Sequence, residues 1–342
     1  MTTAHPSLPR SIKRSTAVAV GALLFLLTGC TAAVEPAPTS VTPNSSSPGI
    51  PATGWVPYFS EEFDEATWID RGWLWFVHPR VWGAYWNTYG DGNNELACLT
   101  PDNLGVDNGE LRITAKREVI TCPSGSQRDF SSGFLSSRDA GRMFPLFGRY
   151  EIRARVPHGQ GLWPAFWLRH ANGAGEAEVD VMEYFHSQVP GEVTQTLHFP
   201  NSISRNTAKS STFIESGDQP SKWHTYAVEI TSGPQGAVQF QFFVDGQPTL
   251  EYLNTDPSSW VDGTDPARTW DMAVNLAVGG DWSGNPDAET LGFLDGPNVC
   301  SITGVAPPDG NPQSCSTDGI RRAEFPAVFD VDYVRVFVPT NS

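Results

Sequence analysis

The stretch that decides the fold of this chain reads Glu178-Val179-Asp180-Val181-Met182-Glu183. On a β-strand successive side chains point to opposite faces, so Glu178 and Asp180 are expected on one face and the two valines on the other. Strict alternation would place a carboxylate at position 182, but Met182 stands there and Glu183 comes one residue late. A β-bulge that absorbs one extra residue would return Glu183 to the acidic face.

Three carboxylates on one face repel one another, which raises the pKa of at least one of them. One Glu can then stay protonated as a general acid while another is an ionised nucleophile, the pairing that glycosidic bond cleavage requires. A solvated polar face is the alternative. Trp163 and Trp167 lie just upstream and favour the catalytic interpretation, because aromatic rings stack on sugar rings. Burial in the core is the alternative for each tryptophan.

Composition narrows the classes of partner. The chain has 342 residues, 39% of them hydrophobic, and a formal net charge of −16. It is long enough to bury a large core, but it repels polyanions. We therefore expect no nucleic-acid partner, since phosphate binding depends on clusters of Lys and Arg. An acidic polysaccharide is disfavoured unless a local basic patch overrides the total, and a neutral glycan fits better. We expect the chain to act as a monomer.

The first 54 residues are expected to lie outside the fold. Basic residues precede an apolar run from Ala17 to Leu27, which is too short to span a bilayer and has the charge order of an export signal. Leu27-Thr28-Gly29-Cys30 resembles a bacterial lipobox, so residues 1–29 are predicted to be a lipoprotein signal with Cys30 as the lipidated residue; an ordinary secretory signal is the alternative. Residues 30–54 are rich in Ala, Pro, Thr and Ser and predict a flexible tether. The protein would be exported and held to the membrane by lipid alone.

Four further cysteines fit disulfide chemistry in an exported protein. Of the three possible connectivities, we favour the sequence-local pairs Cys98 with Cys122 and Cys300 with Cys315. A zinc site is the rival interpretation, but neither pair has the close spacing of a zinc knuckle.

Residues 55–339 are predicted to form one all-β domain. Five segments have the alternation or β-branched composition of strands: 111–115, 150–156, 225–230, 240–244 and 331–336. Asn108-Gly109, Asp245-Gly246 and Gly279-Gly280 stand at strand ends as turn signals. Short strands without helical periodicity predict a β-jelly-roll sandwich with a concave substrate-binding cleft.

A family resemblance follows from motifs that recur in order along the chain. They are Glu62-Phe63-Asp64, Asn93-Asn94-Glu95-Leu96, Ser132-Gly133, Phe147-Gly148-Arg149-Tyr150-Glu151, Gly161-Leu162-Trp163-Pro164-Ala165-Phe166-Trp167, the acidic hexapeptide, Leu197-His198, Trp223-His224-Thr225-Tyr226, Asn275-Leu276-Ala277-Val278-Gly279-Gly280 and Val331-Asp332-Tyr333-Val334-Arg335-Val336. Together they resemble glycoside hydrolase family 16, and the bulged acidic strand resembles its laminarinase type.

The resemblance implies a retaining double displacement without a catalytic cofactor. Glu178 would be the nucleophile, Glu183 the acid and base, and Asp180 the residue that holds and tunes them. Substrate binding is implied for Trp163, Trp167 and His198.

Trp282, in Gly279-Gly280-Asp281-Trp282, is a further candidate for lining the cleft. A structural calcium site on the far face is implied for Glu62, Gly109 and Asp332, with an ordinary metal-free surface turn as the alternative.

One departure from the resemblance concerns specificity. After Ser131-Ser132-Gly133 many laminarinase-like members carry Arg, whereas Phe134 stands here, and Arg138 is the nearby cation that could compensate. The expected substrate is a neutral β-glucan with internal β-1,3 linkages, cut in endo fashion. Mixed-linkage glucan and a galactan are the rival substrates. A non-catalytic carbohydrate-binding protein of the same fold is the rival function.

Overall fold

The computed structural model describes residues 54–64, 76–77, 82–84, 93–138, 142–170, 177–185, 192–198, 207–213, 222–255, 269–287 and 322–340. All of them belong to one unit, Pro48–Ser342. Cys30, the predicted signal and nearly all of the predicted tether lie outside the described residues, as do Cys300 and Cys315. Within the described part, no helix is long and apolar enough to cross a membrane.

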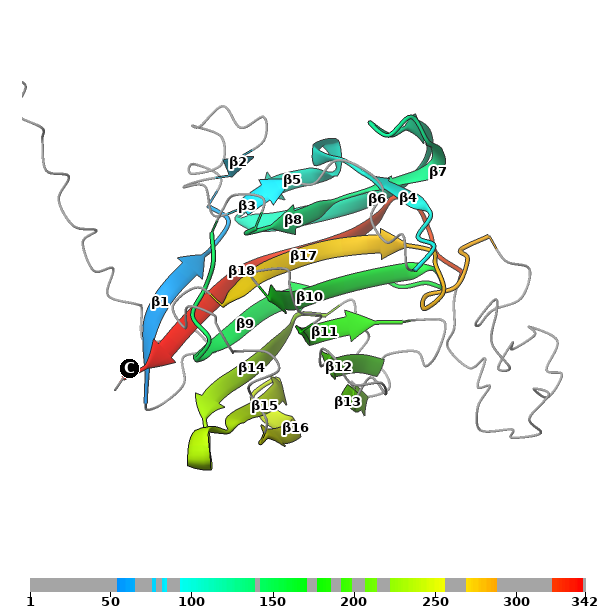
Figure 1. Ribbon diagram of the computed structural model, residues 1–342. Helices are drawn as coiled ribbons and strands as arrows, with labels where there is room; N and C mark the ends of the chain where they lie inside the picture. Colours follow the sequence, from blue (N-terminus) through cyan, green and yellow to red (C-terminus); the bar gives the residue numbers. More distant parts are fainter. Residues whose placement is uncertain are drawn as a thin grey trace, which may run out of the picture. The chain divides into compact units, whose positions relative to one another are not determined.

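Two β-sheets make up the fold (Figure 1). Sheet A runs in the order β16 (Gln247–Asn254), β15 (Val238–Val244), β14 (His224–Ser232), β9 (Gly148–Arg155), β18 (Ala327–Pro339), β6 (Glu110–Thr121), β7 (Gln127–Ser132) and β4 (Ala97–Leu99). β1 (Trp55–Glu61) also pairs with β18, and β5 (Leu104–Asp107) with β6. Sheet B runs in the order β13 (Thr207–Phe213), β12 (Glu192–His198), β11 (Glu178–Tyr184), β10 (Leu162–His170), β17 (Trp270–Val278), β8 (Phe134–Ser136), β3 (Trp82–Ala84) and β2 (Phe76–Val77).

The described helical residues amount to two 3-10 turns, Pro101–Asn103 and Pro234–Gly236. This all-β sandwich confirms the predicted fold class. The five predicted strand segments lie in β6, β9, β14, β15 and β18, with β9 ending one residue earlier than expected. Asn108 and Gly109 both adopt positive φ between β5 and β6, as the turn signal requires.

Alternating side chains build the core between the sheets. In β15, Val238, Phe240, Phe242 and Val244 are buried and the residues between them are half-buried. These side chains belong to one large apolar cluster that also takes in Phe166, Leu168 and Val179 of sheet B. Because the odd-numbered residues from Trp163 to Arg169 lie on the opposite face of β10 from Phe166 and Leu168, they turn away from the core. We call this outward side of sheet B the site face.

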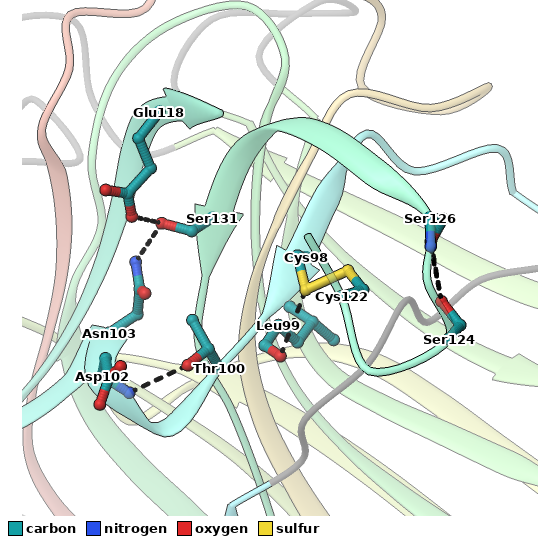
Figure 2. Close-up of a disulfide and its surroundings, with 10 residues drawn as sticks. All are labelled: Cys98, Leu99, Thr100, Asp102, Asn103, Glu118, Cys122, Ser124, Ser126 and Ser131. Carbon is teal, nitrogen blue, oxygen red and sulfur yellow. Dashed lines mark hydrogen bonds between the residues drawn. A yellow bond between two sulfur atoms is a disulfide. The ribbon is translucent and has the colours of Figure 1, made fainter. Parts of the chain in front are cut away.

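A disulfide joins Cys98 of β4 to Cys122, which follows β6 (Figure 2). This is the expected sequence-local pair. It closes a sequence separation of 24 residues at the edge of sheet A, where Cys98 faces the parallel strand β7 at Ser131. In the same region Asn103 donates to Ser131 Oγ at 3.0 Å.

Candidate active site

The three carboxylates of β11 share the site face, as the sequence predicts. Across the β10–β11 pairing, Glu178 faces Arg169, Asp180 faces Trp167 and Glu183 faces Ala165. The register shifts by one residue between Asp180 and Met182, which leaves Val181 as the extra residue. Val181 and Met182 are consequently both buried in the core although they are neighbours in the chain. The predicted bulge is confirmed, and it is what brings Glu183 onto the face of Asp180.

Gln195 of β12 supports the bulge from the neighbouring strand. A bulge takes a backbone group out of the ladder, and a buried carbonyl without a partner is costly. The Gln195 amide donates to the Val181 carbonyl at 2.9 Å and to the Phe243 carbonyl at 3.2 Å. Its own oxygen accepts a hydrogen bond from Thr249. Gln195 is fully buried, so these bonds replace those that water would supply.

Glu183 lies in an environment suited to a general acid. Its side chain is 9% exposed, and Trp163 Nε1 donates to its Oε1 at 3.0 Å. Burial is the largest cause that raises the pKa of Glu183 well above its ordinary value, followed by the charges of Asp180 and Glu178. The Trp163 hydrogen bond acts in the opposite direction. The net effect favours the protonated carboxyl at neutral pH.

Asp180 and His198 form the centre of the acidic group. Asp180 is almost completely buried, and burial together with the adjacent Glu178 raises its pKa well above the ordinary value. His198 faces Glu178 across the β11–β12 pairing. Its Nε2 lies 3.1 Å from Asp180 Oδ2 and 3.7 Å from Glu178 Oε1. Glu178 remains about one third exposed, as a nucleophile that must reach a substrate requires.

Small residues of β17 make room for the two tryptophans of β10. Trp163 faces Ala277 and Trp167 faces Ala273 across the strand pair. Trp167 is half-buried, and its Nε1 donates to Asn275 at 2.7 Å, which fixes the indole. Trp163 is nearly buried, so its hydrogen bond to Glu183 is the role that the structure displays for it.

An aromatic row leads from Glu183 toward solvent. The Trp163 ring lies 5.0 Å from the Phe185 ring, and the Phe185 ring lies 6.2 Å from that of Trp282. Trp282 is 48% exposed, so of these rings it offers the most surface to a sugar.

Phe134, which stands where many laminarinase-like proteins carry an arginine, takes part in aromatic packing. Phe134 is buried and packs edge-on against Trp167 at 6.2 Å. The Arg169 guanidinium lies 5.6 Å from the Phe134 ring and 5.0 Å from the Trp167 ring. Arg138 instead pairs with buried Asp271 and donates to the His170 carbonyl. Arg169, rather than Arg138, therefore brings a guanidinium to Phe134 and Trp167.

Segment Asn93–Leu96 packs on the turn that follows β17. A side chain at Gly279 would overlap Leu96, and one at Gly280 would overlap the Asn93 carbonyl. Both glycines also have positive φ, so two separate constraints select glycine. Glu95 is buried in this contact, and burial raises its pKa to about 7.

The residues of the predicted calcium site converge on one stretch of sheet A. Residue 61 pairs with Val334 of β18, Leu111 pairs with Val331, and Asp332 lies between at a register shift. Glu62, however, binds Arg335 through both carboxylate oxygens, at 2.8 and 2.9 Å.

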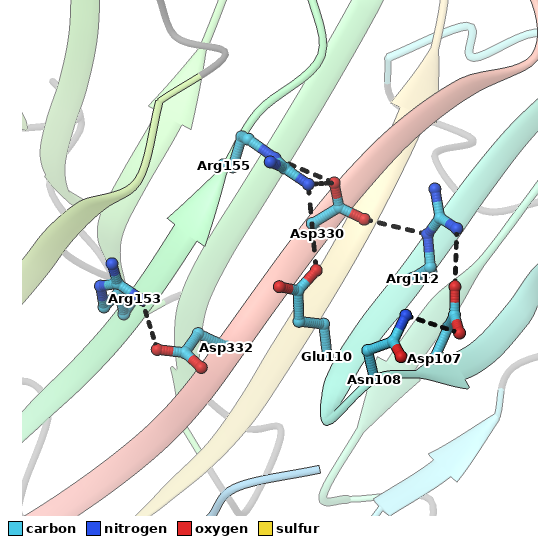
Figure 3. A network of polar contacts seen from close by, with 8 residues as sticks. All are labelled: Asp107, Asn108, Glu110, Arg112, Arg153, Arg155, Asp330 and Asp332. Atoms are coloured by element: carbon cyan, nitrogen blue, oxygen red, sulfur yellow. Dashed lines mark hydrogen bonds and ion pairs between the residues drawn. The ribbon is translucent and has the colours of Figure 1, made fainter. Parts of the chain in front are cut away.

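Asp332 in turn pairs with Arg153, beside a second network around Asp330 (Figure 3). Carboxylate oxygens suit calcium, but the carboxylates of Glu62 and Asp332 already bind arginines. Calcium stays a prediction, and no step of the chemistry depends on it.

Four residues support the site in roles that the sequence did not predict: Gln195, Asn275, Phe185 and Arg169. Gln195 carried a usable signal, since it shares the core-facing positions of β12 with Val193 and Leu197. A lone amide among apolar residues of one strand face indicates a buried backbone group that needs a partner. Neighbouring sequence does not predict the roles of Asn275, Phe185 and Arg169, because each of them contacts a residue of a different segment.

Comparisons with known proteins relate this chain to a family. A family model described as "Glycosyl hydrolases family 16" matches residues 92–293. "Glucan endo-1,3-beta-glucosidase A1" of Niallia circulans is 27% identical over 265 residues, 73% of this chain but 33% of the relative, so the chain spans about a third of that protein. "Beta-glucanase" of Rhodothermus marinus is 27% identical over 301 residues, covering 84% of this chain and 86% of the relative.

A solved structure shows the same fold. The laminarinase catalytic domain of Thermotoga maritima MSB8 superposes with a TM-score of 0.62 and 24% identity. The match covers 84% of this chain and 100% of that domain.

Proposed function

The chain belongs to glycosyl hydrolases family 16, and from this membership we propose that it is a retaining, endo-acting hydrolase of a neutral β-glucan, with internal β-1,3 linkages as the preferred target. The observation that carries the proposal is the set of three carboxylates on one strand face, with Glu183 buried and Glu178 partly exposed. The names of the Niallia and Rhodothermus relatives, a glucan endo-1,3-beta-glucosidase and a beta-glucanase, support a β-glucan as the substrate class.

The proposed reaction has two steps. In the first, Glu183 donates its proton to the glycosidic oxygen while the Glu178 carboxylate attacks the anomeric carbon, which breaks the glycosidic bond and forms a glycosyl ester. In the second, the Glu183 carboxylate takes a proton from water, whose oxygen displaces Glu178 and regenerates both groups. The raised pKa of Glu183 supports the first step, because the group is then protonated when substrate arrives.

Asp180 lies between the two glutamates along β11, and it would orient Glu178 and His198. Trp167 and Trp282 are proposed as sugar platforms, since both retain exposed ring surface. His198 would contact the sugar from β12, which its partial exposure and position beside Glu178 support. Trp163 would act mainly through Glu183.

The linkage preference and location are part of the proposal. Phe134 in place of an arginine leaves mixed-linkage glucan and a galactan as rival substrates. The lipobox-like Leu27-Thr28-Gly29-Cys30 supports an exported, lipid-anchored protein, and Cys30→Ala should release it from the membrane fraction.

Hydrolysis of laminarin, mixed-linkage glucan and agarose, measured in parallel, tests the substrate. We expect laminarin to be cleaved fastest, with short oligosaccharides as early products. Glu178→Ala should abolish cleavage without unfolding, and azide should restore turnover as a glycosyl azide of inverted configuration. Unchanged turnover in Glu178→Ala would refute the assignment of the nucleophile, and cleavage of none of the three glycans would favour the non-catalytic carbohydrate-binding function.

A further inference from the structure

Three side chains on the site face present ligand atoms to a common point. Glu178, Asp180 and His198 each offer one donor atom, and these atoms all lie within 4.8 Å of one another. The strand registers cause this, because Glu178 faces His198 directly and Asp180 lies two residues along the same face. The cluster thus consists of two carboxylate oxygens and one imidazole nitrogen.

The two separations that involve His198 suit a small tetrahedral ion. Bonds of about 2.0 to 2.2 Å to zinc place neighbouring ligand atoms roughly 3.4 Å apart in a tetrahedron. His198 Nε2 lies 3.1 Å from Asp180 Oδ2, slightly closer than this ideal separation, and 3.7 Å from Glu178 Oε1, slightly farther. Imidazole with carboxylate is a donor set for zinc and its neighbours in the first transition row. Calcium and magnesium instead prefer ligand sets made of oxygen alone, whereas one of the three donors here is an imidazole nitrogen.

A second observation points to a ligand at this place. Asp180 is 2% exposed, and its Oδ2 accepts no hydrogen bond from any group in the part of the chain that the structure describes. Oδ2 is also the atom that faces His198 Nε2. A buried carboxylate oxygen in this state is unfavourable, and a cation bound to it would remove the cost.

Access and charge also favour an ion. Glu178 and His198 are 35% and 37% exposed, so a hydrated ion can enter and keep a water at its fourth position. The net charge of −16 raises the local concentration of cations around the chain.

We propose that Glu178, Asp180 and His198 form an inhibitory binding site for a divalent transition ion of the zinc type. The ion would occupy the carboxylate that the proposed function assigns as the nucleophile, so ion and glycan would exclude one another. Only this competition rests on the proposed function. Binding of the ion does not.

Calorimetric titration of the full chain with zinc chloride, without glycan, tests the site itself. We expect one zinc per chain, weakened more than about tenfold in both His198→Gln and Asp180→Asn. His158→Gln is the matched control, because His158 lies on the loop after β9 outside the cluster, and its zinc affinity should equal that of the unaltered chain. Magnesium chloride should give no comparable heat.

Cobalt(II) provides a measurement that needs no variant. The unaltered chain should give the intense visible bands of four-coordinate cobalt, and zinc should displace them. Weak six-coordinate bands, equal zinc affinity in His198→Gln and the unaltered chain, or equal losses in His158→Gln and His198→Gln would each overturn the site.

Steady-state assays on laminarin then test the competition. Zinc should raise KM and leave kcat unchanged, with an inhibition constant that matches the calorimetric Kd. Zinc binding without any glucan cleavage would refute the proposed function and leave the ion site standing. Cleavage without zinc binding would do the reverse.

Discussion

The indole of Trp163 donates a hydrogen bond to Glu183 Oε1 at 3.0 Å, from a ring that is itself 9% exposed. The two residues lie on adjacent strands, β10 and β11, with Ala165 directly opposite Glu183. Trp163 thus fixes the orientation of the proposed acid and counteracts part of the rise in its pKa that burial causes. It is a positioning residue for Glu183.

Trp163→Phe keeps the ring and removes the N–H donor. Because that donor stabilises the carboxylate, its loss should raise the pKa of Glu183 further, and the alkaline limb of the kcat profile should move to higher pH. We expect kcat at the optimum to fall about 10- to 150-fold, since a hydrogen bond to a charged group contributes about 1.5 to 3 kcal/mol. KM should change little. Trp167→Phe is the control and should leave the alkaline limb in place; a rise in KM alone for Trp163→Phe would indicate a sugar platform instead.

Glu95→Gln should stabilise the protein at alkaline pH. The folded state keeps the Glu95 proton up to a pKa of about 7, whereas the unfolded state releases it near 4.5. Between these values the folded state binds more protons, so stability is full below about pH 4.5 and falls as pH rises through 7. At roughly 1.4 kcal/mol per pKa unit, the variant should gain about 3 kcal/mol at pH 8 and nothing at pH 4.

Urea unfolding at the two pH values measures this difference. Glu324→Gln, at an exposed position, is the matched control and should show no such dependence. An equal gain of Glu95→Gln at pH 4 and pH 8 would contradict the linkage.

Trp282→Ala should weaken substrate binding and spare the chemistry. Its ring is 48% exposed at the solvent end of the aromatic row, so loss of stacking should raise KM by about two- to tenfold, which corresponds to roughly 0.5 to 1.5 kcal/mol. Initial rates on laminarin measure the effect. Val119→Ala, 69% exposed on β6 of the other sheet, should leave KM unchanged. A loss confined to kcat would argue against a platform.

Gln195→Leu should destabilise the bulge. The change leaves the buried Val181 and Phe243 carbonyls without the amide, at an expected loss of about 1 to 3 kcal/mol in the free energy of unfolding. Because Glu183 follows the bulge, kcat should fall as well. Thr249→Val, which removes only the hydroxyl that donates to Gln195, should cost less in both measurements. Equal losses in the two variants would mean that the Val181 carbonyl does not need its donor.

Cys98→Ser should lower stability by about 3 kcal/mol, because the Cys98–Cys122 bridge closes a separation of 24 residues in the unfolded chain. Differential calorimetry of the single and double serine variants measures the loss. The double variant should lose no more than either single variant. If reduction of the unaltered chain leaves its Tm unchanged, the bridge does not contribute to stability.

Much of the candidate site follows from short-range pattern. The alternation from Glu178 to Asp180 predicts a strand, and the late Glu183 predicts a bulge, because side-chain direction depends only on position along one strand. Asn108-Gly109 likewise predicts its turn from the backbone freedom of two residues. Short-range pattern does not predict the contact of Phe134 with Trp167. These residues lie on β8 and β10, which become near neighbours only because each pairs with one edge of β17 in the folded sheet.

By itself, then, the sequence determined the central strands, the phase of the three carboxylates, and membership of a family whose motifs run through the domain. The tertiary structure decided which groups surround those carboxylates. Strand order and register bring distant segments together and so create these contacts. They are the hydrogen bond of Trp163 to Glu183, the approach of His198 to Asp180, and the stacking of Arg169 on the rings of Trp167 and Phe134. The pKa of Glu183 is set in the same way, because burial and neighbouring charge exist only once the sheets have packed.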